Sequence, residues 1–98
     1  MNYQDLIDKA LQGRSVYKLA KALELNQVTL NRYVKGDRLP DFGTALLLAK
    51  EANVTPGEVL VILAEEERRK REMKELLSQG FRLLTNALNR LFTRVSAA

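Results

Sequence analysis

Apolar residues recur every three or four positions along most of the chain, which is the spacing of one face of a helix. This pattern predicts six helices, over about residues 3–12, 15–23, 26–36, 41–52, 56–77 and 81–95. The strict alternation typical of a strand is absent from the sequence, and proline occurs only at positions 40 and 56. We therefore expect an all-α protein.

Residues that favour helix ends stand where these helices are expected to begin and end. Asn2, Ser15 and Asn26 are good N-caps, and Gly36 is a typical stop. Residues 55–58, Thr-Pro-Gly-Glu, match a capping box with proline at the first helical position. The side chains expected to face a common core are Leu6, Ile7, Ala10, Leu11, Val16, Leu19, Ala20, Leu23, Phe42, Ala45, Leu46, Ala49, Val59, Leu60, Ile62 and Leu63.

The hydrophobic pattern changes after Ala64. Residues 65–72 contain no apolar side chain, and acidic residues precede basic ones by four positions, which favours a solvent-exposed helix. A flexible charged linker is the competing interpretation. Gly80 is expected to break or kink the chain, so that the last helix starts at Phe81 and carries one apolar stripe.

The segment from 26 to 36 has the two faces needed by a helix that packs on a core and enters a DNA groove. At about 100° per residue, Leu30, Tyr33 and Val34 share one side. The residues on the other side, which we predict to read bases, are Gln27, Val28, Asn31 and Arg32. Gln and Asn can pair with adenine, Arg with guanine, and Val can contact a thymine methyl group. Taken singly, each of these residues also fits an ordinary exposed helix.

Positive charge is concentrated around this segment. Between Arg14 and Arg38 there are six basic and two acidic residues, whereas the rest of the chain has ten of each. The whole net charge of +4 therefore lies here, as expected for a surface that binds phosphates. The residues predicted to contact DNA phosphates are Ser15, Tyr17, Lys18, Lys35 and Arg38.

Composition argues against most other functions. The 98 residues include no cysteine and no histidine, which removes disulfides, thiolate metal sites and the commonest general base. We expect no cofactor, metal, small-molecule ligand or catalytic residue. No apolar run approaches the ~20 residues needed to cross a bilayer, and no signal segment opens the chain, so a cytoplasmic location is expected.

The segment LAKALELNQVTLNRYVKGDRLP, residues 19–40, resembles the helix-turn-helix of the Cro and repressor family of bacteriophage and bacterial regulators. The residues that fall on that family's signature positions are Leu19, Ala20, Leu23, Leu30, Gly36 and Pro40. The continuation PDFGTALLLAKEANVTPGEVL is similar to the family's fourth and fifth helices. More narrowly, YKLAKAL, the Pro40-Asp41 pair and TPGEVL look like small phage-related proteins of filamentous and prophage type. The resemblance covers about residues 3–64.

The resemblance implies a five-helix, lambda-repressor-like DNA-binding domain. The family's base-reading positions fall on Gln27, Val28, Asn31 and Arg32, and its phosphate contacts fall near Ser15, Lys35 and Arg38. The chain departs from the family at two positions. Glu24 stands where the turn often has glycine, and Val16 stands where the helix often has a phosphate-binding glutamine. We divide the chain into a DNA-binding domain, residues 1–64, and a charged helical extension with a dimerisation helix, residues 65–98, called the tail.

The tail is expected to hold copies of the chain together. Two-fold dimers bind DNA half-sites ~34 Å apart, whereas a single domain covers only one half-site. The residues predicted to form a homodimer, or a higher oligomer, are Met73, Leu76, Leu77, Phe81, Leu84, Leu88, Leu91, Phe92 and Val95. A tail that folds back on its own domain is one alternative, and an amphipathic helix on a membrane surface is another.

These observations predict a sequence-specific transcriptional regulator that binds double-stranded DNA. The expected role is that of a phage or prophage repressor, bound as a dimer to a palindromic operator. The alternative is an antitoxin-like or anti-repressor module whose tail binds a partner protein. An enzyme is disfavoured, because the sequence offers none of the usual catalytic constellations.

Overall fold

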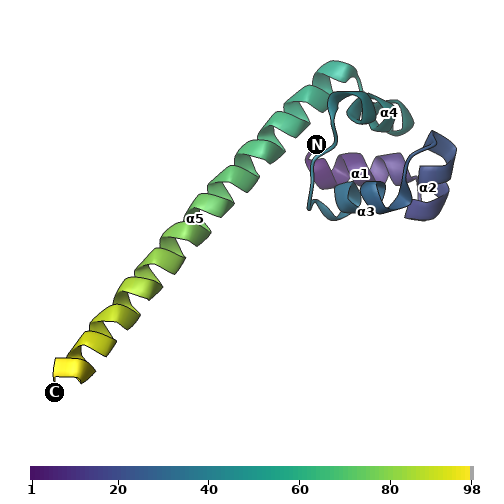
Figure 1. Cartoon of the computed structure of the whole chain (residues 1–98). Helices are drawn as coiled ribbons and strands as arrows, with labels where there is room; N and C mark the ends of the chain where they lie inside the picture. Colours follow the sequence, from purple (N-terminus) through teal and green to yellow (C-terminus); the bar gives the residue numbers. More distant parts are fainter. Residues whose placement is uncertain (98) are drawn as a thin grey trace. The chain divides into compact units, whose positions relative to one another are not determined.

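The computed structural model describes the backbone of residues 1–97 and the side chains of residues 1–93. Within that range the chain forms five helices and no strand (Figure 1). The helices are α1 (Tyr3–Leu11), α2 (Val16–Leu23), α3 (Gln27–Lys35), α4 (Phe42–Ala52) and α5 (Pro56–Ala97). The chain divides into two compact units, Met1–Glu67 and Arg68–Ala98. The prediction of an all-α fold is confirmed.

N-capping side chains fix the residues at which the helices begin. Backbone amides three residues further on donate hydrogen bonds of 2.8–3.2 Å to the side chains of Asn2, Ser15, Asn26 and Asp41. At the start of α5 the Thr55 hydroxyl accepts one of 3.2 Å from the Glu58 amide. Each bond satisfies an amide that the helix itself leaves unpaired. The hydrogen bonds from Thr44 also hold the pKa of Asp41 below its usual value.

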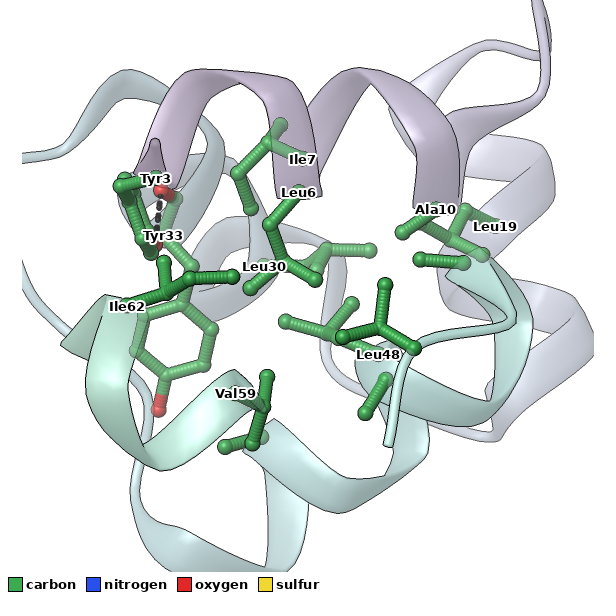
Figure 2. Packing of buried hydrophobic residues seen from close by; sticks show 14 of the residues in the cluster. Tyr3, Leu6, Ile7, Ala10, Leu19, Leu30, Tyr33, Leu48, Val59 and Ile62 are labelled. Carbon is green, nitrogen blue, oxygen red and sulfur yellow. Dashed lines mark hydrogen bonds between the residues drawn. The ribbon is translucent and has the colours of Figure 1, made fainter. Parts of the chain in front are cut away.

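One hydrophobic core lies within the unit Met1–Glu67, and all five helices contribute to it (Figure 2). The largest fully buried side chains are Leu6 and Ile7 of α1, Leu19 of α2, Leu30 of α3, Leu48 of α4 and Val59 of α5. Within this unit α1 packs on α4, and α2 packs on α3. Full burial of one such side chain contributes roughly 1.5–3 kcal/mol. This core therefore holds α2 and α3 in place.

Two positions predicted for the core are exposed instead. Phe42 is 57% exposed and Leu60 is 47% exposed. Phe42 is the first residue of α4 and lies roughly 70° from the centre of the stripe that buries Leu48 and Ala49. Leu60 lies about 100° around α5 from the buried Val59, so it faces away from the core.

The prediction that a separate helix starts at Phe81 after a break at Gly80 is wrong, because α5 continues from Pro56 to Ala97. Glycine keeps its backbone N–H and costs a helix only about 1 kcal/mol relative to alanine. The residues on either side of Gly80 are compatible with a helix, so this single unfavourable residue does not end α5. The linker interpretation of residues 65–77 is also wrong, since these residues are helical.

The C-terminal part of α5 carries no buried side chain within the described range. Every described side chain from Arg71 to Thr93 is exposed. The Arg68 Nε and Glu72 Oε1 atoms are 4.0 Å apart, one helical turn away from each other, and such exposed pairs add little stability. Val95, which belongs to the predicted dimerisation set, lies outside the described side chains. In the described part of the chain no helix is apolar over a length that could cross a bilayer.

Candidate nucleic-acid interface

The turn between α2 and α3 is closed by a residue in the left-handed conformation. Glu24 has φ 55° and ψ 41°, and the Leu25 amide donates a 2.8 Å hydrogen bond to the Ala20 carbonyl. Glu24 occupies the position at which the Cro and repressor family often has glycine. A side chain in this conformation costs roughly 1–2 kcal/mol. The turn that glycine usually makes is therefore formed here at some cost in stability.

The inner face of α3 is fixed by burial and by both helix ends. Leu30 and Tyr33 are buried, and the half-buried Val34 packs against the same core. Asn26 caps the first turn, and Gly36, at φ 78°, ends the last one. The left-handed φ suits glycine, which has no Cβ to oppose it. This face of α3 agrees with the prediction from the sequence.

A hydrogen bond from α1 holds the C-terminal end of α3. The Tyr3 hydroxyl donates to the Tyr33 carbonyl at 2.7 Å, and both side chains are buried (Figure 2). Burial is the main cause of the raised pKa of Tyr3, with further contributions from Glu66 and Tyr33. The hydroxyl therefore stays protonated and able to donate. No local sequence pattern indicates this contact, because its partners are 30 residues apart.

The outer face of α3 carries the residues predicted to read bases. Gln27, Val28 and Arg32 are exposed, and Val28 is 64% exposed although it is apolar. Asn31 is half-buried. Within the described residues, no hydrogen bond or ion pair engages the side chains of Gln27 or Arg32. Donor, acceptor and methyl groups are thus presented on one side of a helix whose other side is buried.

The residues predicted to contact phosphates come from the start of α2, the end of α3 and the loop that follows α3. Ser15, Tyr17, Lys18, Lys35 and Arg38 are all exposed. Ser15 caps α2, and a helix N-terminus presents unpaired amides that suit an anion. Val16, in contrast, is half-buried and packs against the core. It offers no polar group at the position where the family often has glutamine.

Arg14 has a structural role that the sequence does not indicate. Its Nη2 atom donates to Glu51 Oε2 of α4 at 2.9 Å and to the Ala10 carbonyl at 3.0 Å. Its Nε atom donates to the Leu11 carbonyl at 3.0 Å. The guanidinium thereby caps the end of α1 and ties it to α4. Counted without Arg14, residues 15–38 hold five basic and two acidic side chains, so the region remains positive.

Two capped helices of eight and nine residues, joined by a short left-handed turn and exposing a polar outer face, define a helix-turn-helix protein of the DNA-binding class. The family model for helix-turn-helix domains matches residues 9–59, more than half of the chain. The chain belongs to the helix-turn-helix family, of the Cro and repressor type, and is a DNA-binding transcriptional regulator. No curated protein and no solved structure matches the chain.

The family assignment also bears on catalysis. The helix-turn-helix family is a family of DNA-binding regulatory domains and not of enzymes. Within the described residues, no group of three or more acidic side chains is placed to hold a metal ion. The match therefore supports a DNA-binding role for residues 9–59.

Proposed function

We propose that this protein is a repressor of phage or prophage type that binds a palindromic operator as a homodimer. The outer face of α3 is the observation that carries the proposal. Gln27, Val28 and Arg32 are exposed there on a helix whose opposite side, with Leu30 and Tyr33, is buried and which is capped at both ends. A repressor of this kind acts in the bacterial cytoplasm on nucleoid DNA, by occluding a promoter.

In this proposal the two groups of surface residues have different roles. Gln27, Val28, Asn31 and Arg32 contact base edges in the major groove. The residues that contact phosphates are Ser15, Tyr17, Lys18, Lys35 and Arg38. Phosphate contacts position a protein on DNA, whereas base contacts give it sequence preference. The two roles can be separated by substitution.

Selection of bound sequences from a random DNA pool, at a stated salt concentration, tests this proposal. The expected result is a spaced inverted repeat, because a two-fold dimer reads two half-sites ~34 Å apart. Failure to enrich any sequence would contradict base reading. Enrichment of a single, unrepeated site would contradict the dimer alone.

Arg32→Ala and Lys35→Ala form a matched pair, since both remove an exposed positive charge from α3. Arg32→Ala is expected to cost ~1–3 kcal/mol on the selected site and to relax the preference for one base pair. Lys35→Ala is expected to weaken binding to all sequences alike and to reduce its salt dependence. Titrations on the selected site and on a scrambled one measure both effects. Equal losses on the two DNAs for Arg32→Ala would count against base reading by Arg32.

We assign residues 1–64 to DNA binding and the tail, residues 65–98, to self-association. The large apolar side chains predicted for the dimer are exposed as far as side chains are described, to residue 93. Light scattering at micromolar concentration is expected to give a mass of at least two chains. A monomer under these conditions would contradict the dimer.

The exposed apolar side of the tail is also the observation that favours a second function, that of an antitoxin-like or anti-repressor module. In that case the tail binds a different protein, and DNA binding is secondary. Purification of the full chain from its own host, followed by mass determination, separates the two. A stoichiometric second polypeptide would favour this alternative.

A further inference from the structure

The apolar residues of the tail fall into two rows along α5. The first row is Leu77, Phe81, Leu84, Leu88 and Leu91, with spacings that alternate between four and three residues. The second row is Met73, Leu76, Gly80, Leu83 and Ala87, with spacings that alternate between three and four. An average spacing of 3.5 residues is that of the contact seam between supercoiled helices. One unbroken helix therefore presents two such seams.

The two rows point in different directions. At about 100° per residue, their centres lie roughly 80–90° apart around the helix. A helix in a two-stranded coiled coil has one neighbour and needs one seam. In a bundle of four helices placed at the corners of a square, each helix has two neighbours, about 90° apart around its axis. The angle between the two rows matches this arrangement.

The leucine side chains of both rows are exposed in the part of the chain whose side chains are described. Leu83 of the second row is 71% exposed, and the adjacent Leu84 of the first row is 58% exposed. Phe81 and Phe92, at 71% and 68%, together expose on the order of 200–350 Å², given roughly 150–250 Å² for one such side chain. Two side chains alone thus approach the lower end of the roughly 300–600 Å² found for the largest apolar patch on a typical monomer.

A dimer formed through the first row alone would leave much of this surface in water. Met73, Leu76 and Leu83 would remain exposed beside the contact. The opposite side of the helix is polar, with Gln79, Asn86 and Thr93 along it. Gly80 and Ala87 in the second row are small enough to let a neighbouring helix come close, and the space around Gly80 is open. Packing on two sides buries both rows and leaves the polar side in water.

We propose that four copies of this chain assemble through the tail, with the first and second rows of each helix against two different neighbours. The proposal rests on the self-association in the proposed function, for which the first row supplies the dimer contact, and it adds a second contact. The resulting tetramer carries four copies of α3. It can hold two palindromic operators at once, whereas a dimer holds one.

Leu83 and Leu84 provide a matched test, because they are the same residue type, adjacent in one helix and both exposed. Light scattering and sedimentation of the full chain are expected to give four times the 11.1 kDa mass of one chain. Leu83→Lys is expected to give a dimer, since only the second row is interrupted. Leu84→Lys is expected to give a monomer or a weak dimer. Asn86→Lys, on the polar side, adds the same charge and is expected to remain a tetramer.

The outcomes separate this proposal from the proposed function. A wild-type dimer that Leu83→Lys leaves unchanged would overturn the tetramer and leave the dimeric repressor standing. A wild-type monomer would overturn both, and flotation of that monomer with anionic lipid vesicles would assign the apolar side to a membrane. A tetramer that survives Leu83→Lys would overturn the role of the second row. Thermal unfolding of each variant is monitored by circular dichroism. A cooperative transition verifies that the unit Met1–Glu67 is folded.

A DNA capture experiment tests the functional consequence. One copy of the sequence recovered by selection is fixed to beads, and a second, labelled copy is supplied in solution. The wild-type chain is expected to retain the labelled copy. Leu83→Lys is expected to bind the beads equally well and to lose the labelled copy. Equal retention by the two proteins would overturn the claim that the second row joins two DNA sites.

Discussion

Helix α3 and the tail have similar amphipathic patterns but bury different amounts of their apolar sides. In α3 the apolar residues Leu30 and Tyr33 are buried, and the polar side is exposed. In the tail the large apolar residues from Met73 to Phe92 are exposed as well. A helical pattern therefore predicts the helix and its apolar side. It does not predict which surface covers that side.

This difference suggests how the two helices obtain their stability. The apolar side of α3 is covered by residues of the same chain, so its stability does not depend on protein concentration. The large apolar side chains of the tail from Met73 to Phe92 are exposed, and we propose that further copies cover them. Stability gained by association depends on concentration through mass action. Substitutions in the two helices should differ in this respect.

The largest expected effect comes from leucine-to-alanine changes in each helix. Leu30→Ala removes a fully buried side chain and is expected to lower the free energy of unfolding by about 2–5 kcal/mol at every protein concentration. Leu84→Ala is expected to leave the unfolding of the DNA-binding domain unchanged in dilute solution and to reduce the stabilisation seen at higher concentration. Urea titrations at two concentrations measure both. Equal, concentration-independent losses would mean that Leu84 belongs to the core of the domain.

A smaller effect is expected where α1 holds the end of α3. Tyr3→Phe removes the hydrogen bond to the Tyr33 carbonyl and is expected to cost about 1 kcal/mol, with faster amide exchange in the last turn of α3. Tyr17→Phe is the control, since Tyr17 is exposed. Equal stability losses in the two variants would contradict an anchoring role for Tyr3.

The same hydroxyl gives the domain a pH dependence in alkaline solution. In the unfolded chain Tyr3 ionises near the ordinary tyrosine pKa of 10.0, whereas burial raises its pKa in the folded chain. Its contribution to stability is therefore complete below about pH 10 and is lost as the pH rises beyond that value. Urea titrations between about pH 9 and pH 11 should show a steeper loss for the wild type than for Tyr3→Phe. Parallel curves would contradict this contribution.

The smallest expected effect concerns Glu24 in the turn before α3. Glu24→Gly relieves the left-handed side chain and is expected to raise the free energy of unfolding by up to about 1 kcal/mol, after the entropic cost of glycine in the unfolded chain. It also removes a negative charge from the turn beside the proposed DNA-reading helix. Glu24→Gln removes the charge but keeps the strained side chain. Thermal unfolding separates the two variants, and equal melting temperatures would mean that the conformation carries no cost.

The features predicted correctly from the sequence depend on neighbours along the chain. Asn2, Ser15 and Asn26 cap helices because a short polar side chain reaches an amide three residues away. The apolar side of α3 follows from the same local spacing. The prediction of a break at Gly80 is wrong because one glycine destabilises a helix by only about 1 kcal/mol. The many other residues of α5 favour its continuation more than this.

The features that the sequence does not reveal depend on contacts between distant residues. The bonds from Tyr3 to Tyr33 and from Arg14 to Glu51 join residues 30 and 37 positions apart. The predictions for Phe42 and Leu60 are wrong because their exposure depends on the faces of α4 and α5 that meet the core. The base-reading and phosphate residues remain predictions, because their test requires DNA.

The residues that hold α3 are different from the residues that it presents. Leu30, Tyr33 and the caps Asn26 and Gly36 fix the helix. The exposed side chains of Gln27, Val28 and Arg32 take no part in the core. Libraries randomised at these three outward positions should therefore consist mostly of folded proteins. This small domain is thus a scaffold on which new operator preferences could be engineered by exchanging one side of a nine-residue helix.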